Sequence, residues 1–114
     1  MSLERVLKIF KRFGFSKTDA EVYIYLAKKG PRRETDLSAS LNITKQQLYR
    51  SLKNLKNKGI VTVTLEQSDL FSAVSFERVL DLLVKVNFEQ ARAIKETKEE
   101  LLASWKSMNT EFST

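Results

Sequence analysis

One stretch of the chain concentrates side chains that bind nucleic acids well. Residues 45–58 carry Lys, Gln, Arg and Asn on a helical pattern, and none of these 14 residues is Asp or Glu. Arginine can donate two hydrogen bonds to guanine, glutamine and asparagine can pair with adenine, and lysine neutralises phosphate. An ordinary solvated helix surface usually mixes both charge signs. The pattern therefore favours DNA recognition over a plain solvated surface.

A helical wheel at 100° per residue separates two faces of this segment. Leu48, Leu52 and Leu55 share one side and form the predicted inward face. The outward side and its two flanks are polar or amphipathic. Gln46, Arg50, Lys53 and Asn57 lie opposite the leucines, with Lys45, Tyr49 and Lys56 on one flank and Gln47 and Asn54 on the other.

A second basic group precedes this segment. Arg32 and Arg33 follow Gly30-Pro31, and Lys28 and Lys29 come just before it. These side chains could hold phosphates beside the same groove. Loop arginines are also often only solvated, so both interpretations stay open here.

Helix-end signals predict the elements that come first. Apolar residues at helical spacing indicate an amphipathic helix over Leu3–Phe13, which Gly14 ends. Ser16 with Asp19 three residues later is an acidic variant of the capping box. It predicts a second, central helix that ends at Gly30-Pro31.

The next helix is short and leads into the polar segment. Thr35 is its expected cap, and Asn42 occupies the sharp turn after it, where left-handed backbone angles suit asparagine. Thr44 and Gln47 complete a further capping box, and Gly59 lies just past the end of the following helix. Two helices joined by so short a turn form a helix-turn-helix unit.

After Gly59 the apolar period changes to two. Residues 60–65 and 70–74 are predicted to be the strands of a hairpin with a polar turn at 66–69, which makes a wing. Glu66 and Asp69 lie at its tip, and the wing has no Lys or Arg. Insertion of an arginine into the minor groove is therefore not available, and bracing the helix is an alternative role.

The C-terminal third predicts one long helix. No Gly or Pro follows Ser75, and the helical pattern continues to about Met108, a length near 50 Å, with residues 109–114 expected to be frayed. Steps of four and three residues mark a stripe that includes Lys98 and Met108. Its predicted dimerisation residues are Leu80, Val84, Asn87, Ala91, Ile94, Leu101 and Trp105.

A helix this long extends past any surface that a small domain offers, which favours a seam between two chains. An Asn within such a seam can pair with its symmetry mate and specify the two-stranded state. The alternative is that Phe76–Phe88 packs on the first helix of its own chain and the remainder is loose.

Charge is distributed unevenly along the chain. The 114 residues carry a net charge of +6. Residues 1–59 hold 14 Lys and Arg against 5 Asp and Glu, a net +9, whereas residues 60–114 hold 6 against 9, a net −3. This separation indicates a first part that binds a polyanion and a second part with another role.

Composition also excludes several functions. The chain lacks Cys and His, which removes disulfides, imidazole acid–base catalysis and nearly all zinc sites. Glu34 and Asp36, like Glu99 and Glu100, are near neighbours in sequence rather than a converging catalytic pair. We therefore expect no enzyme, no cofactor and no metal. No apolar run approaches the ~20 residues that cross a bilayer, and the N-terminus lacks a signal-peptide profile, so the expected location is cytoplasmic.

Three segments resemble a known family. GFSKTDAEVYIYLAKKGP, ITKQQLYRSLKNLKNKGIV and FSAVSFERVLDLLVK are similar to the winged-helix DNA-binding domain of the TrmB family, archaeal transcriptional regulators often responsive to sugars. The resemblance covers roughly Phe13 to Val86. It implies DNA-facing positions that agree with the wheel, namely Lys45, Gln46, Gln47, Tyr49, Arg50 and Lys53.

The resemblance has departures. Asn42 stands where a glycine is common, and the wing lacks the basic residues of many members. In that family the long helix links and dimerises the DNA-binding domains, and a large ligand-binding domain usually follows it. The chain ends before such a domain, so we expect either a DNA-binding fragment or a small stand-alone relative.

The predicted fold is mainly α: an α+β winged helix-turn-helix with a three-helix core, a two-stranded wing and a long C-terminal dimerisation helix. Residues 1–75 form the DNA-binding domain and residues 76–114 the dimerisation helix. The predicted function is that of a homodimeric, sequence-specific regulator of transcription on double-stranded DNA. The alternative is a winged-helix protein-interaction module of the general transcription machinery.

Overall fold

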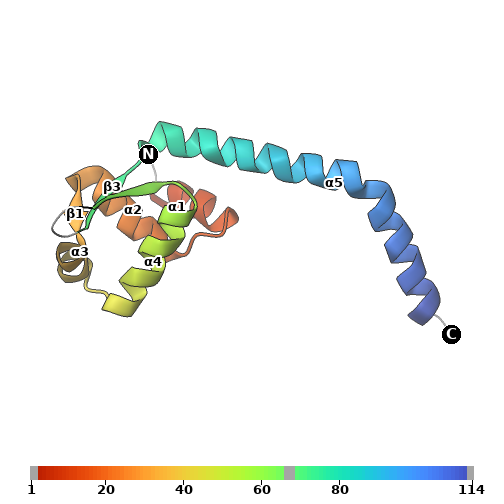
Figure 1. The fold of residues 1–114 in the computed structure, drawn as a ribbon, viewed down its shortest axis with the longest axis horizontal. Helices are drawn as coiled ribbons and strands as arrows, with labels where there is room; N and C mark the ends of the chain where they lie inside the picture. Colours follow the sequence, from red (N-terminus) through yellow and green to blue (C-terminus); the bar gives the residue numbers. More distant parts are fainter. Residues whose placement is uncertain (1–2, 66–68, 113–114) are drawn as a thin grey trace. The chain divides into compact units, whose positions relative to one another are not determined.

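The computed structural model describes residues 3–65 and 69–112 (Figure 1). In chain order the elements of this part are α1 (Leu3–Arg12), α2 (Lys17–Lys29), β1 (Arg32–Arg33), α3 (Glu34–Leu41), α4 (Lys45–Asn57), β2 (Val61–Thr64), β3 (Leu70–Ala73) and α5 (Phe76–Phe112). This order confirms the mainly α winged helix-turn-helix with a long C-terminal helix. The hairpin turn predicted at residues 66–69 lies, except for Asp69, outside the described residues.

The chain divides into two compact units, Met1–Val79 and Leu80–Thr114. The first unit contains α1 to β3 and the first turn of α5. Val79 in that turn is fully buried, and its N–H donates to the Ser75 carbonyl at 2.9 Å. The first unit thus extends four residues past the boundary placed between residues 75 and 76 from the sequence.

Local capping explains where α2 begins, and the backbone explains where α3 begins. The Ser16 hydroxyl accepts a hydrogen bond from the Asp19 N–H at 3.0 Å, and the Asp19 carboxylate accepts one from the Ser16 N–H at 2.9 Å.

The prediction of Thr35 as the cap of α3 was wrong. Arg33 is the N-cap, with no side-chain cap bond, because its extended backbone already belongs to β1 and leads directly into Glu34.

The predicted two-stranded wing is the antiparallel pair β2–β3, and β1 adds a third antiparallel strand that was not predicted, in the order β1-β3-β2. Val63 and Arg32 both pair with Phe71, on opposite edges of β3. Pro31 fixes its own φ and favours extended backbone, so Arg32 and Arg33 can pair with the free edge of β3. A strand of two residues shows no alternation, which is why the sequence indicated a loop there.

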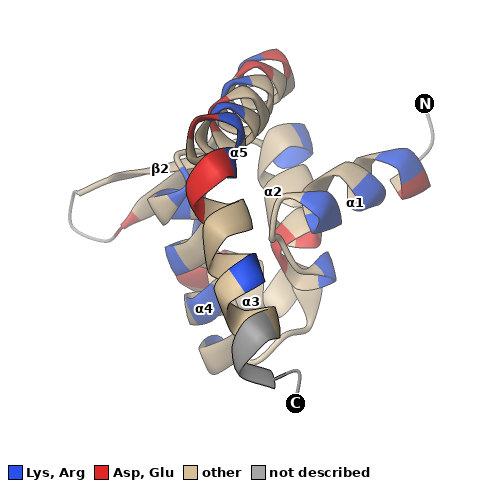
Figure 2. Cartoon of the chain, turned by 90° about the vertical axis from the view of Figure 1, so that its right-hand side faces the viewer, with Lys and Arg blue, Asp and Glu red and all other residues tan. Residues whose placement is uncertain are grey.

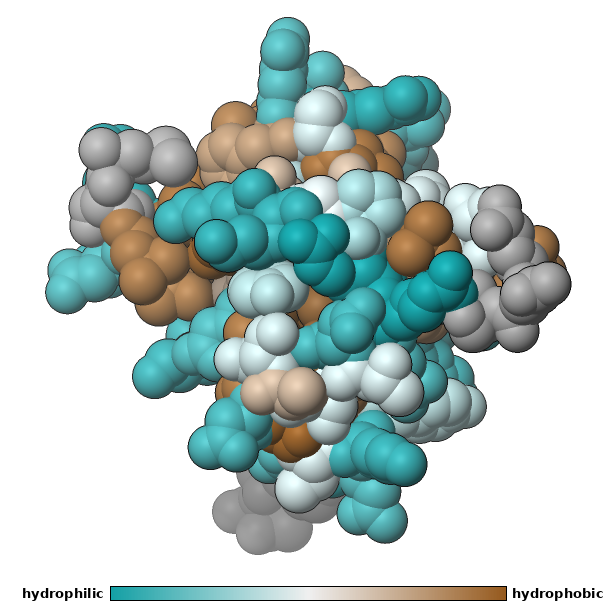
Figure 3. All heavy atoms as spheres, turned by 90° about the vertical axis from the view of Figure 1, so that its left-hand side faces the viewer, coloured by the Kyte–Doolittle hydropathy of each residue, from teal (hydrophilic) through white to brown (hydrophobic). Residues whose placement is uncertain are grey.

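An aromatic cluster fills the core of the first unit. The ring of Phe10 lies 5.2 Å from that of Phe15 and 5.3 Å from that of Tyr23, centroid to centroid. The Tyr23 hydroxyl donates to the Val74 carbonyl at 2.6 Å, and burial raises the pKa of Tyr23 to about 12. The surface seen in Figure 3 is mostly hydrophilic, with hydrophobic residues in separate patches.

Helix α5 differs from the rest of the chain in its exposure. It continues to Phe112, so the prediction that residues 109–114 fray was wrong as far as Phe112. Every residue from Val84 to Asn109 is exposed. Neither α5 nor any other helix in the described part of the chain is long and apolar enough to cross a membrane.

Candidate nucleic-acid interface

The turn between α3 and α4 sets the direction of α4. Asn42 adopts left-handed angles (φ 52°, ψ 49°), as the sequence predicted, and the Ser38 hydroxyl donates to the Ile43 carbonyl at 3.0 Å. The Thr44 hydroxyl then accepts a bond from the Gln47 N–H, and the Gln47 amide oxygen accepts one from the Thr44 N–H, each at 3.1 Å. This confirms the capping box. It also occupies the oxygen of Gln47 and leaves its amide N–H groups to donate.

The two faces of α4 are those of the helical wheel. Leu48, Leu52 and Leu55 are buried, whereas Tyr49 is 62% exposed. The carboxylate-free face is exposed as well, and it comprises Lys45, Gln46, Gln47, Arg50, Lys53, Lys56 and Asn57. Figure 2 shows the basic residues of α1 and α4 in blue. The structure thus brings the six predicted α4 residues onto one accessible helix surface.

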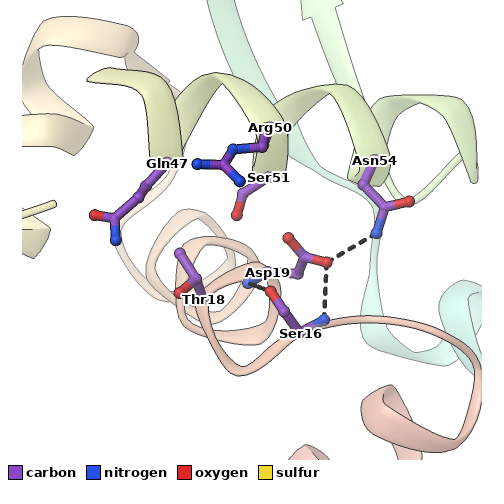
Figure 4. A pocket seen from close by; sticks show the side chains of 7 residues that line it. All are labelled: Ser16, Thr18, Asp19, Gln47, Arg50, Ser51 and Asn54. Atoms are coloured by element: carbon purple, nitrogen blue, oxygen red, sulfur yellow. Dashed lines mark hydrogen bonds between the residues drawn. The ribbon is translucent and has the colours of Figure 1, made fainter. Parts of the chain in front are cut away.

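A buried carboxylate connects α4 to α2. Asp19 is only 5% exposed, and its Oδ2 accepts hydrogen bonds from the Ser16 N–H and, at 2.8 Å, from the Asn54 amide (Figure 4). Asn54, predicted on a flank of the outward face, is therefore half-buried and structural. Nothing local in the sequence connects two residues 35 positions apart, but Asp19 was already visible as a capping residue.

A second contact connects the end of α4 to the end of α1. The Lys58 ammonium donates to the carbonyls of Phe13 and Gly14 at 3.0 and 3.1 Å and lies 4.4 Å from the centroid of the Phe15 ring. Gly14 has φ +86°, and a Cβ there would lie 2.8 Å from the Lys58 nitrogen. Together with the Asp19–Asn54 bond, this contact fixes the position of α4 in the unit.

The structure separates the two arginines of β1. Arg32 is half-buried, and its Nη1 donates to the Pro31 carbonyl at 2.8 Å. A hydrogen bond with Ser40, and the nearby Arg32 guanidinium, lower the pKa of Tyr25. Arg33 is exposed. Arg32 is thus partly engaged within the protein, whereas the predicted phosphate role of both residues stays a prediction.

Two of the hollows beside α4 reach α2 or the sheet. One, of about 420 Å³, lies between α4 and the start of α2 and is shown in Figure 4. Its lining residues are Ser16, Thr18, Asp19, Gln47, Arg50, Ser51 and Asn54. The other, of about 350 Å³, has Tyr49, Lys53 and Lys56 on the α4 side and Val63, Asp69 and Phe71 on the sheet side.

The carboxylates form no centre of their own. Glu34 and Asp36 are exposed in the first turn of α3, and Glu99 and Glu100 are exposed on α5. Across residues 3–65 and 69–112, no group of three acidic side chains comes together in a way that could hold a metal ion. These residues are thus part of the solvated surface.

The predicted dimerisation residues lie on one face of α5. Leu80 is half-buried, and the other six, from Val84 to Trp105, are exposed. Val84 is 68% exposed, Ile94 63% and Trp105 60%, which is unusual for large apolar side chains. Phe88 and Leu102, which the sequence did not single out, widen this face, at 68% and 43% exposed. Phe88 lies four residues after Val84, and Leu102 four residues after Lys98. This helical spacing could have indicated that both belong to the same face.

The family model for the "sugar-specific transcriptional regulator TrmB" matches residues 10–77 of the chain. The chain belongs to the TrmB family. The matched segment contains α2, the helix-turn-helix, the wing and the first residues of α5. It therefore covers all of the candidate interface on α4.

One curated relative and two solved structures show what the chain is similar to. The HTH-type sugar sensing transcriptional regulator TrmBL1 of Pyrococcus furiosus is 28% identical over 98 residues, which cover 86% of the chain and 29% of that protein. The structure of TrmBL2, an archaeal chromatin protein, superposes with a TM-score of 0.77 at 18% identity, over 99% of the chain and 43% of TrmBL2. The ST1889 protein of Sulfolobus tokodaii gives 0.67 at 22% identity, over 82% of the chain and 98% of ST1889.

The lengths of these relatives limit the comparison. The chain spans less than a third of TrmBL1 and less than half of TrmBL2. Sugar sensing is named for TrmBL1, and a novel mode of DNA binding is described for TrmBL2. The structural likenesses, at 18% and 22% identity, establish the winged-helix fold.

Proposed function

We propose that the chain is a sequence-specific regulator of transcription that binds double-stranded DNA as a homodimer, with α4 in the major groove. The observation that carries this proposal is the exposed face of α4. The 13 residues of this helix include three lysines and one arginine, all exposed, and no carboxylate. An α-helix fits the width of the major groove, where side chains such as Gln and Asn distinguish base pairs. Membership of the TrmB family supports the same function.

The way α4 is held supports recognition rather than loose electrostatic attraction. The Thr44–Gln47 capping box orders its N-terminus, and the contacts of Asn54 and Lys58 hold its C-terminal half. A binding surface on a rigid element positions its donors more accurately than one on a loop. Gln46, Tyr49 and Lys53 on this helix are the residues that we expect to contact the groove.

The proposed dimer rests on α5. Exposed apolar side chains arranged on one helix face are stabilised when a second copy covers them, and steps of four and three residues are typical of a two-helix seam. Two copies of α4 would then contact two half-sites about one helical turn, or a multiple of it, apart. An inverted-repeat operator follows from that symmetry.

The test is the binding of the purified chain to a duplex from the promoter of its own gene, measured against mixed-sequence duplexes. Preference for one duplex, protection of two half-sites and a Lys53→Ala variant that is weaker on every duplex would support the proposal. If the unmodified chain binds all duplexes equally, and Lys53→Ala loses a complex with transcription proteins, the protein-interaction module would be favoured instead.

A further inference from the structure

The hollow between α4 and the start of α2 has an opening to solvent and a polar lining (Figure 4). It lies beside the exposed α4 face, so any group bound there would be next to DNA lying along α4. Thr18 and Gln47 lie at one end of the hollow, and Asp19 with Asn54 at the other, while Arg50 and Ser51 project from α4 between them. The two ends differ in the chemistry that they offer.

Ser51 is the least expected residue of this lining. It is only 3% exposed, and its hydroxyl forms no hydrogen bond within the described part of the chain. The hydroxyl therefore depends on solvent, or on a group that enters the hollow, for a hydrogen-bond partner. Figure 4 shows the hydroxyl directed into the hollow, and its oxygen is not sealed from solvent. Ser51 can therefore donate to a group that enters.

The start of α2 supplies further donors at the same place. The first N–H groups of a helix have no partner within the helix, and the positive end of the helix dipole favours an anion there. Ser16 caps the N–H of Asp19 only, which leaves those of Lys17 and Thr18. The hydroxyl of Thr18 and the amide of Gln47, whose oxygen is already used by Thr44, add two more donors.

The charges of the lining residues favour an anion at one end of the hollow. Arg50 is the one cation and Asp19 the one anion among the lining residues. Asp19 already accepts hydrogen bonds from Ser16 and Asn54, and it would repel an anion placed over it. An anion is therefore most favourable near Thr18, Gln47 and Arg50, within reach of the Ser51 hydroxyl.

We propose that this end of the hollow binds one phosphate of the DNA backbone, at the edge of the groove that α4 enters. This inference rests on the proposed DNA-binding function and adds a specific contact to it. It assigns Ser51 and Thr18, which do not belong to the exposed face of α4, to DNA binding. It also assigns Arg50 to a phosphate rather than to a guanine.

A matched pair of charge variants tests the proposal through a gain in duplex affinity. Damage to the fold would lower the affinity and so could not produce this result. Asp19→Asn keeps an oxygen for the Ser16 and Asn54 donors but removes the repelling charge, so affinity for a mixed-sequence duplex should rise about threefold. Glu21→Gln removes the same charge from exposed surface two residues further along α2, and it should have a smaller effect. Equal effects of the two variants would overturn the proposal.

Two further variants remove donors. Ser51→Ala should weaken duplex binding about tenfold without lowering the melting temperature, because a hydroxyl bonded to a charged group is lost and alanine is a good helix former. Arg50→Ala should weaken promoter and mixed-sequence duplexes equally and reduce the salt slope by about one. Loss of sequence preference with Arg50→Ala, or no change with Ser51→Ala, would contradict the phosphate contact.

The same experiments separate this inference from the function on which it rests. Absence of duplex binding by the unmodified chain would overturn both. Normal binding that Lys53→Ala weakens, with Ser51→Ala and Asp19→Asn unchanged, would overturn the phosphate contact alone.

Amide NMR distinguishes a backbone phosphate from a free anion. The Thr18 and Ser51 signals should move with the duplex and barely with inorganic phosphate at matched ionic strength. Full movement with inorganic phosphate, together with duplex affinity that Ser51→Ala leaves unchanged, would assign the hollow to a free anion and overturn the proposal.

Discussion

Helices α4 and α5 both expose one face, but the two faces have opposite chemistry. The face of α4 is polar and cationic, and the helix is held by its cap, by Asn54 and by Lys58. The face of α5 is apolar, with Val84, Ile94 and Trp105 each at least 60% exposed. A polar face is stable in water without a partner, whereas large exposed apolar side chains are stabilised by burial.

This difference indicates two kinds of binding in one short chain. The cationic face suits a polyanion, and its binding energy comes largely from released counterions. In the proposed dimer a second copy covers the apolar face, and the binding energy would come from area removed from water. Each kind responds to a different perturbation, so the two can be separated experimentally.

Salt should separate the two faces most strongly. If about six phosphates are neutralised per dimer, the logarithm of the DNA affinity should fall against that of the salt concentration with a slope near −5, about a thousandfold over a fourfold rise in salt. Dimer association through α5 should change little, since apolar contact is not screened. Fluorescence anisotropy and sedimentation measured over one salt series would check both. A flat DNA curve would contradict the role of α4.

Charges placed on the apolar face should produce the next largest effect. Ile94→Glu combined with Leu101→Glu should give a monomer whose DNA affinity is about a hundredfold lower, because a linked second site raises avidity by factors of this size. Ala103→Glu is the control, since Ala103 is exposed and lies opposite the stripe on a helical wheel. Sedimentation gives the oligomeric state. A dimer in the double variant would place the interface elsewhere.

Removing the support of α4 should have a smaller effect, on stability. Asn54→Ala leaves the buried Asp19 carboxylate with one donor fewer, which should cost about 1–3 kcal/mol of the free energy of unfolding. Asn57→Ala, on the exposed side of the same helix, should stay within about 0.5 kcal/mol. Urea denaturation measures both variants. Equal stabilities would mean that the Asp19–Asn54 bond does not hold α4 in place.

These support contacts also mark where prediction from sequence ended. The capping boxes, the left-handed Asn42 and the inward leucines of α4 were predictable because each depends on residues within a few positions. The Asp19–Asn54 bond and the Lys58 contacts join residues 35 to 45 positions apart, and no local pattern encodes them. Strand β1 was missed for a related reason, since its pairing depends on the distant edge of β3.

The smallest expected effect concerns the single Asn in the α5 stripe. Asn87 is exposed in the protomer, and in a two-chain seam it would face its symmetry mate. A polar residue there specifies pairing at a cost in stability, so Asn87→Leu should give a dimer, or a higher oligomer, at least as stable as the parent. Ser107→Leu, an exposed polar residue on the opposite side of the wheel, should leave association unchanged. Sedimentation equilibrium over a range of concentrations would measure both. Weaker association of Asn87→Leu would mean that Asn87 stabilises the dimer by a contact of its own, and unchanged association would place Asn87 outside the seam.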